Sequence, residues 1–157
     1  MSKLIECVPT ISEGTDLNQI DKIAKSVLNH EGVKLLNIDP GKATNRTVIT
    51  FVGPPEIIVD AAYSLISKAK ELIDMRSHKG EHPRMGAVDV CPFIPISGVS
   101  MKETVDLAHQ LGKRVGSELL IPVYCYENAA KNKQRVNLAN CRSGEYEGLK
   151  NKLGDVK

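Results

Sequence analysis

The stretch TVITFVGPPEIIVDAAYSLISKAKELID, residues 47–74, carries the clearest fold signal in the sequence. Its first part, Thr47–Val52, is rich in β-branched residues and predicts a strand. Gly53 and two prolines follow, and Pro55 suits the first turn of a helix because its missing N–H would have no partner there. From Pro55 to about Asp74 the apolar residues keep one face at helical spacing. The stretch therefore predicts a strand that leads directly into a long helix.

The sequence on either side continues the alternation of strands and helices. Upstream it predicts a strand at Leu4–Val8 ended by Pro9, a helix with apolar positions from Leu17 to Leu28 ended by Gly32, and a strand at Val33–Ile38 ended by Asp39-Pro40-Gly41. Downstream it predicts a strand at Ala87–Ile96, a helix from a capping box of Ser100 and Glu103 to Leu119, and a strand at Pro122–Tyr126. Prolines at positions 92 and 95 indicate an edge strand or a bulge.

These elements follow the order β-α-β-β-α-β, with a further α-β unit after them. The first six form the split βαβ pattern of ferredoxin-like folds. We therefore predict an α+β fold, with a mixed sheet covered by helices on one face, as a single domain over residues 1–157. The tail from Asn128 to Lys157 is polar and has sparse apolar anchors. It predicts either a solvated helix or a segment that packs on something absent from this chain.

The composition is that of a soluble globular domain. Of the 157 residues, 41% are hydrophobic and 25% are charged, enough for one domain with an apolar core. The net charge of +2 and the aromatic content of 4% do not indicate nucleic-acid binding. No run of about 18 apolar residues predicts a membrane span, and the first residues lack the apolar core of a signal peptide. We expect a cytoplasmic protein that binds neither nucleic acid nor membrane.

The cysteine pattern indicates free thiols. The four cysteines lie far apart and form no C-x-x-C pair: Cys7, Cys91, Cys125 and Cys141. Three of them occur in apolar, strand-like runs, where cysteine behaves as a small buried hydrophobic residue. Free thiols are typical of a reducing compartment.

The loop Arg76–Gly86 is the best candidate for an active-site segment. It reads RSHKGEHPRMG and collects two histidines and three cations in a few residues. Long polar loops inside compact domains often carry function. We expect His82 to move a proton, because imidazole titrates near neutrality and Pro83 stiffens the chain beside it. Three charged neighbours could tune that basicity: Lys79, Glu81 and Arg84.

The same loop offers an alternative chemistry. The letters HKGEH, residues 78–82, match H-x-x-E-H, the inverted zinc-protease motif. That motif needs both histidines on one face of a helix, one turn apart. Gly80 weakens such a helix, and Pro83 biases His82 toward extended geometry. We therefore favour acid–base catalysis without a metal over a zinc hydrolase.

Two further loops could border the same site. Asp39–Arg46, DPGKATNR, follows an apolar strand that could hold the Asp39 carboxylate firmly, although Asp-Pro-Gly is also common turn chemistry. Pro9–Gly14, PTISEG, is a third segment that could border the site.

His78 is a weaker catalytic candidate than His82. The histidines outside these loops, His30 and His109, are expected to be structural or solvated.

Several segments, taken in order, resemble the formiminotransferase family. They are ECVPTISEG (6–14), NRTVITFVGPPE (45–56), LIDM (72–75), HKGEHPRMG (78–86), DVCPFIP (89–95) and SGEYEGL (143–149). The most specific part is HKGEHPRMGAVDVCPFIP. The catalytic histidine of the family lies in this loop and falls on His82.

The resemblance implies a reaction and a set of roles. The family moves a formimino group from N-formiminoglutamate to N5 of tetrahydrofolate, which is a co-substrate. One histidine can serve as general base and then as general acid, and this role falls on His82. Because the substrates carry carboxylates, Arg46, Lys79 and Arg84 are expected to orient them. Asp39 could accept hydrogen bonds from the pterin or from the amidinium.

The resemblance also implies that the site is incomplete. The family's transferase unit has two similar halves with the folate in a groove between them, and this chain corresponds to the first half. We expect weak or no turnover from the chain alone, and a homo-oligomer or a partner chain that covers the exposed apolar face. The chain is then either a fragment or a natural half that needs a partner. The competing hypothesis is a non-catalytic half-domain that binds folate or a partner.

Overall fold

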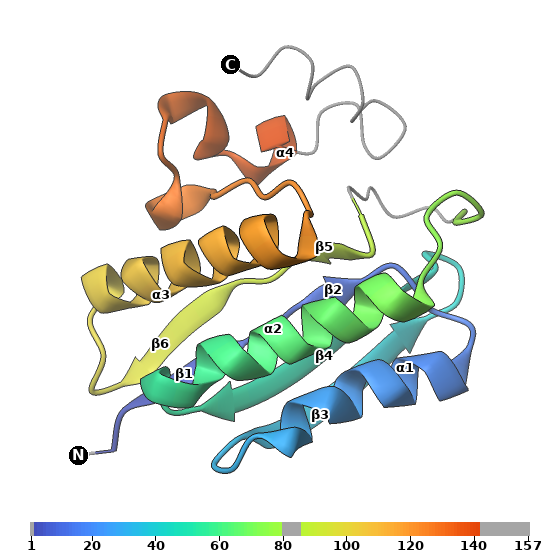
Figure 1. Cartoon of the computed structure of the whole chain (residues 1–157), viewed down its shortest axis with the longest axis horizontal. Helices are drawn as coiled ribbons and strands as arrows, with labels where there is room; N and C mark the ends of the chain where they lie inside the picture. The colour runs from blue at the N-terminus through green and yellow to red at the C-terminus, as the bar shows by residue number, and fades with distance from the viewer. Residues whose placement is uncertain (1, 80–85, 142–157) are drawn as a thin grey trace.

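An antiparallel sheet carries helices on one face in the computed structural model, which describes residues 2–79 and 86–141 (Figure 1). The strands are β1 (Leu4–Cys7), β2 (Thr10–Ile11), β3 (Lys34–Gly41), β4 (Arg46–Gly53), β5 (Val88–Val90) and β6 (Phe93–Ser97). They lie in the order β5-β2-β4-β1-β6, and β3 pairs with β4. The α+β class is confirmed. The expected mixed sheet is wrong, since every strand pair in the described ranges is antiparallel.

Prolines interrupt the strands at two places. The expected strand Leu4–Val8 is confirmed as β1, and a short strand that was not expected, β2, follows Pro9; both pair with β4. The expected strand 87–96 appears as β5 and β6 around Pro92. Proline has no N–H to donate to a ladder, so each strand is interrupted where the proline stands.

The strand β3 is longer than the sequence predicts. Asp39, Pro40 and Gly41 were expected to end it, but they pair with Val48, Thr47 and Arg46 of β4. That expectation was wrong because β3 pairs with β4 alone, and an edge strand tolerates a proline whose missing N–H faces away from the ladder.

Two of the three main helices begin after a residue whose side chain caps them, and the third begins at a proline. They are α1 (Leu17–Lys25), α2 (Pro55–Leu72) and α3 (Met101–Arg114), with 3-10 turns at Ser26–Asn29 and a π-turn at Val115–Leu119. The Asp16 carboxylate caps α1 by accepting from the N–H groups of Asn18 and Gln19. The predicted cap at Ser100 is confirmed, since its Oγ accepts from the Glu103 N–H at 3.1 Å.

The core lies between the sheet and the helices. Along β4 the residues Thr47, Ile49 and Phe51 are fully buried beneath the helices, while the residues between them are half-buried on the other face. Figure 1 shows α1, α2 and α3 on the same side of the sheet. The opposite, open face carries the exposed side chains of Leu36, Ile94 and others.

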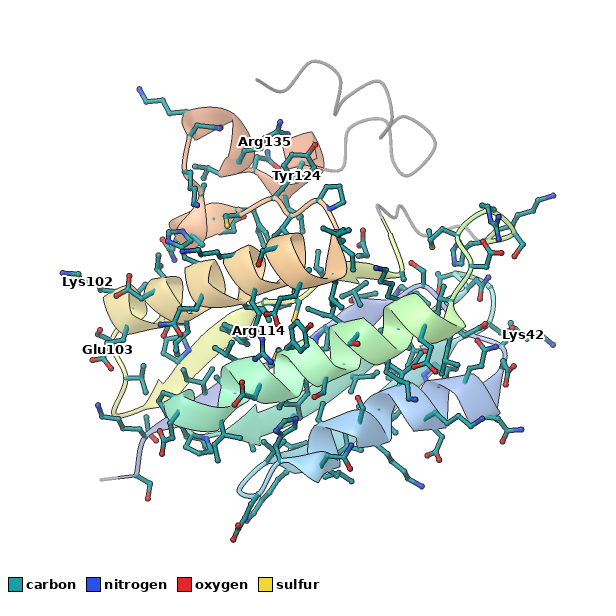
Figure 2. All side chains as sticks on the ribbon, in the orientation of Figure 1. Lys42, Lys102, Glu103, Arg114, Tyr124 and Arg135 are labelled. Carbon is teal, nitrogen blue, oxygen red and sulfur yellow. The ribbon has the colours of Figure 1, made fainter. Side chains whose placement is uncertain are left out.

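One arginine links α2 and α3. Arg114, labelled in Figure 2, extends from α3 toward α2. Its Nη1 lies 2.6 Å from the Asp60 carboxylate, its Nε lies 3.1 Å from Glu118, and its guanidinium stacks 3.9 Å from the centroid of the Tyr63 ring. Partial burial acts against its charge, but Asp60 and Glu118 outweigh this and raise the pKa of Arg114. The cation therefore joins the two helices at their exposed edge.

The segment after α3 departs from prediction. The expected strand at 122–126 is absent from the described structure, because Leu120 turns the chain with a φ of 57° and Pro122 has no N–H for a ladder. The described tail forms 3-10 turns at Glu127–Ala129 and Lys133–Arg135 and the short helix α4 (Leu138–Cys141), not one long solvated helix. Residues 142–157 lie outside the described residues. No helix in the described ranges is long and apolar enough to cross a membrane.

Candidate active site

Three polar segments meet at one end of the sheet. They are residues 12–14 after β2, the turn 42–45 between β3 and β4, and residues 75–79 after α2 (Figure 1, right). Each belongs to one of the three loops that the sequence singled out. The structure thus brings together segments that lie more than thirty positions apart in the chain.

Asn45 connects all three segments. Its side-chain Oδ1 accepts a hydrogen bond from the Gly14 N–H at 2.9 Å, and its Nδ2 donates to the Lys79 carbonyl at 2.8 Å. Its own carbonyl accepts from His78 Nε2 at 2.8 Å. Asn45 has a φ of 50°, a left-handed conformation that asparagine tolerates better than most residues.

Residues 12–14 hold the other end of the loop that follows α2. The Ser12 Oγ donates to the Gly86 carbonyl at 2.7 Å, and the Ser12 N–H donates to the Ala87 carbonyl at 2.8 Å. Gly14 is pressed against the hairpin, because a Cβ placed there would overlap the Gly41 carbonyl and lie 2.6 Å from the Arg46 nitrogen. The loop is therefore attached at both described ends to the same edge of the molecule.

His78 has a structural role in this arrangement. It is buried, and its Nε2 must carry the proton because the Asn45 carbonyl can only accept. The other two described histidines are also bonded within the fold: His30 to the Ser64 hydroxyl at 2.7 Å, and His109 to the Ala129 carbonyl at 2.8 Å.

Asp39 and Arg46 lie on the open face at this end of the sheet. Asp39 pairs with Val48, and Arg46 stands two residues before Val48 on the same strand, so all three side chains share one face. The Arg46 Nε is buried and has no hydrogen-bond partner among the described residues. Asp39 is exposed. A carboxylate and a guanidinium therefore stand beside each other next to the loop anchors.

The remaining predicted site residues fall on the loop itself. Lys79 is exposed, and its backbone carbonyl is the group that Asn45 binds. Glu81, His82 and Arg84 lie outside the described residues. Arg76 is paired with Asp74, whose pKa is lowered to about 2 by the Arg76 side chain and backbone N–H. Among the described residues no cluster of three candidate metal ligands occurs.

The sequence did not single out Asn45 or Ser12. The available signal for Asn45 was an asparagine at the end of a polar turn, where a left-handed residue is often needed. Ser12 belongs to the candidate segment Pro9–Gly14, but the sequence did not predict which groups it would bind. Their partners are backbone groups in distant loops, and a sequence pattern does not specify such contacts.

A cavity adjoins the loop that follows α2. It has a volume of about 930 Å³ and is lined by α3, the β5–β6 region, residues 120–129 and the loop residues Met75, Arg76 and Gly86. Cys91, Cys125 and Cys141 line it together with many apolar side chains. All four cysteines are free, as expected, and Cys7 Sγ lies 3.6 Å from Cys91 Sγ. Burial raises the pKa of the Cys7 and Cys125 thiols, which favours the neutral, unreactive form.

Comparison with known proteins places the chain in a family. The family model described as the N-terminal subdomain of the formiminotransferase domain matches residues 4–157. The chain belongs to this family. Three relatives illustrate the similarity: formimidoyltransferase-cyclodeaminase from Rattus norvegicus is 54% identical over 98% of the chain, the same enzyme from Dictyostelium discoideum is 50% identical over 100%, and glutamate formimidoyltransferase from Streptococcus pyogenes serotype M1 is 43% identical over 98%.

The formiminotransferase relatives are longer than the chain. The match covers 28% of the Rattus norvegicus protein, 29% of the Dictyostelium discoideum protein and 51% of the Streptococcus pyogenes protein. The chain therefore spans about half or less of these relatives. The resemblance predicted from the sequence motifs is confirmed at the level of the family and its N-terminal subdomain.

Proposed function

We propose that this chain forms one wall of a transferase site that moves a formimino group from N-formiminoglutamate to N5 of tetrahydrofolate. One observation carries the proposal: the loop that resembles the family's catalytic segment is attached at both ends beside Asp39 and Arg46. The relatives named as formimidoyltransferases are similar over nearly the whole chain, which supports the same reaction class.

His82 moves the protons in this proposal. N5 of tetrahydrofolate attacks the amidine carbon of N-formiminoglutamate and forms a tetrahedral centre. His82 accepts the proton that N5 loses and then donates a proton to the departing glutamate nitrogen as the old C–N bond breaks. The products are 5-formiminotetrahydrofolate and glutamate, and no external oxidant or reductant is needed.

The charged neighbours bind and orient the substrates. Arg46, Lys79 and Arg84 pair with substrate carboxylates. The unpartnered Nε of Arg46 supports this role, because a buried donor without an acceptor costs about 1–3 kcal/mol and a bound ligand could satisfy it. Asp39 accepts from donor groups of the pterin or from the amidinium, and Glu81 tunes the basicity of His82.

A second transferase subdomain supplies the opposite wall. The open sheet face supports this part of the proposal, because it combines Asp39 and Arg46 with exposed apolar residues: Leu36, Ile94 and Ile96. Apolar patches of this kind are typical of interaction surfaces. The chain alone would then turn over weakly or not at all, and a homo-oligomer or partner chain in the cytoplasm would cover this face.

A ferredoxin-like arrangement is part of the same proposal. The split strands count as two, so the sheet reads β3, β4, β1–β2 and β6–β5, with α1 and α2 on one face. This order agrees with a β-α-β-β-α-β unit. Helix α3 is an addition that covers β6.

Replacement of His82 tests the function. In the natural full-length protein, formation of 5-formiminotetrahydrofolate should fall about 100-fold or more in His82→Ala, while tetrahydrofolate still binds. His109→Gln is the matched control, because that histidine makes one backbone hydrogen bond far from the loop. Near-normal transfer in His82→Ala would refute the assignment.

A non-catalytic half-domain is the second candidate. It is favoured by the fact that the matches cover only 28% to 51% of the three relatives. It predicts tetrahydrofolate binding without transfer, even when the remaining transferase subdomain of a relative is supplied. If transfer recovers when that subdomain is added, the chain is part of an enzyme and the non-catalytic hypothesis is wrong.

A further inference from the structure

We propose that Asn45 is a positioning residue for this transfer, and the inference rests on the function proposed above. Its side chain and carbonyl hold residues 12–14, the β3–β4 turn and the start of the 79–86 loop in one fixed arrangement. Asn45 itself does not touch the reacting atoms. It acts by setting where the described ends of the loop, Lys79 and Gly86, stand relative to Arg46.

The contacts of Asn45 are unusually far-reaching for a turn residue. One residue supplies an acceptor to Gly14, a donor to Lys79 and a second acceptor to His78, each at 2.8 to 2.9 Å. These partners lie 31 to 34 positions away in the sequence. Each partner group belongs to the backbone except the His78 ring, so the bonds fix the paths of the loops and not only their side chains.

The left-handed backbone does not by itself explain an asparagine here. With a φ of 50°, glycine would fit this position at least as well, because it has no Cβ to resist a positive φ. Glycine would keep the carbonyl that His78 needs but would lose both side-chain hydrogen bonds. The amide therefore adds the links to Gly14 and Lys79, which the turn alone does not need.

These links determine the distance between the two ends of the loop. Asn45 binds Lys79 directly at the first end. At the second end Ser12 binds Gly86, and Ser12 stands two residues from Gly14, which Asn45 also binds. Arg46 is the next residue in the chain, so a shift of Asn45 moves the loop ends relative to the guanidinium. A displacement of about 1 Å in such a frame can lower turnover by about 100-fold.

Two substitutions at Asn45 separate positioning from folding. Asn45→Gly keeps the turn and removes both side-chain bonds. Asn45→Asp keeps the acceptor for Gly14 but removes the donor for the Lys79 carbonyl. Ser64→Ala is the matched control, because it removes a 2.7 Å hydrogen bond between elements, to His30, away from the loops.

Kinetics of the natural full-length protein give the first readout. In Asn45→Gly, kcat should fall about 100-fold while KM changes less than about threefold, and the pH profile of kcat should keep its midpoint because His82 is intact. In Asn45→Asp, kcat should fall about tenfold, because only one of the two side-chain hydrogen bonds is lost. Ser64→Ala should retain kcat. Parent-like kcat in a folded Asn45→Gly protein would overturn the proposal.

Amide hydrogen exchange gives a second readout that does not require activity. Exchange of the Gly14 N–H, which donates to Asn45, and of the Ser12 N–H, which donates to the Ala87 carbonyl, should quicken in Asn45→Gly and not in Ser64→Ala, while α1 and α2 exchange as in the parent. If the parent shows no transfer, the proposed function fails. The exchange pattern still tests whether Asn45 holds these loops in place. Unchanged exchange at Ser12 and Gly14 would overturn the positioning role.

Discussion

The polar end of the sheet and the apolar cavity differ in what they can do. The cavity has a volume of about 930 Å³, its lining is mostly apolar, and burial raises the pKa of the Cys125 thiol that borders it. The polar end meets this cavity at Met75, Arg76 and Gly86, but Asp39 and Arg46 stand outside the cavity lining, among loops fixed by directional hydrogen bonds. Catalysis of proton and group transfer needs charged groups held in place. Size alone is therefore a poor guide to the candidate site.

The core and the region around the cavity differ in packing. The fully buried side chains come almost entirely from β1 to α2, whereas β5, β6 and the described tail contribute mostly half-buried residues. Cys7 shows the boundary, because its two cross-strand neighbours are Phe51 on β4 and Phe93 on β6. Phe51 is fully buried, and Phe93 borders the cavity.

The largest effect should come from that pair of phenylalanines. Phe51→Ala removes a ring from the closely packed core and should lower the free energy of unfolding by about 3–5 kcal/mol. Phe93→Ala enlarges a space that is already open and should cost about half as much. Urea denaturation of both variants measures the difference. Equal losses would mean that the β5–β6 region is as tightly packed as the rest.

A methyl group at Gly14 should have the next largest effect. Its Cβ would overlap the Gly41 carbonyl and lie 2.6 Å from the Arg46 nitrogen, and backbone atoms cannot give way easily. Gly14→Ala should therefore destabilise the fold by about 3 kcal/mol. At Gly86 the nearest atom to a Cβ is the Val88 carbonyl at 3.9 Å, so Gly86→Ala is the matched control and should change stability by less than about 0.5 kcal/mol. A harmless Gly14→Ala would show that residues 12–14 do not press on the hairpin.

The smallest effect concerns the ion pair at the start of the loop. The pKa of Asp74 is lowered to about 2 from an ordinary 3.8, so its ionised form favours the folded state. This contribution is present above the unfolded pKa and is lost as the pH falls from about 4 through about 2. The stability difference between the parent and Asp74→Asn should therefore shrink over that window, as denaturation midpoints at several pH values would show. Because the pair is exposed, the difference is small, and a constant difference would refute the pairing.

Local sequence signals predicted the regular elements of the fold. Ser100 and Glu103 gave a cap, and the apolar face from Pro55 gave α2 to within two residues of its end. The same signals failed at prolines. Pro40 was read as a stop, but an edge strand does not need its N–H. Pairing partners are tertiary information, so neither the antiparallel sheet nor the missing strand at 122–126 followed from the local pattern.

The candidate site was predictable in its composition but not in its connections. The three loops were identified because each concentrates polar and backbone-shaping residues. Their meeting point depends on Asn45 and Ser12, which bind backbone groups that every residue possesses. Side-chain type does not reveal which carbonyl a distant amide will find, and so these two residues emerged only from the structure.

Ligand-dependent amide exchange tests most directly whether the polar end is the site. The natural full-length protein would be compared with and without saturating tetrahydrofolate, and exchange would be followed peptide by peptide. We expect slower exchange in residues 10–14 and 39–46, which do not border the cavity, and no change in residues 104–126, which do. Protection confined to residues 104–126 would contradict this expectation and place the ligand in the cavity instead.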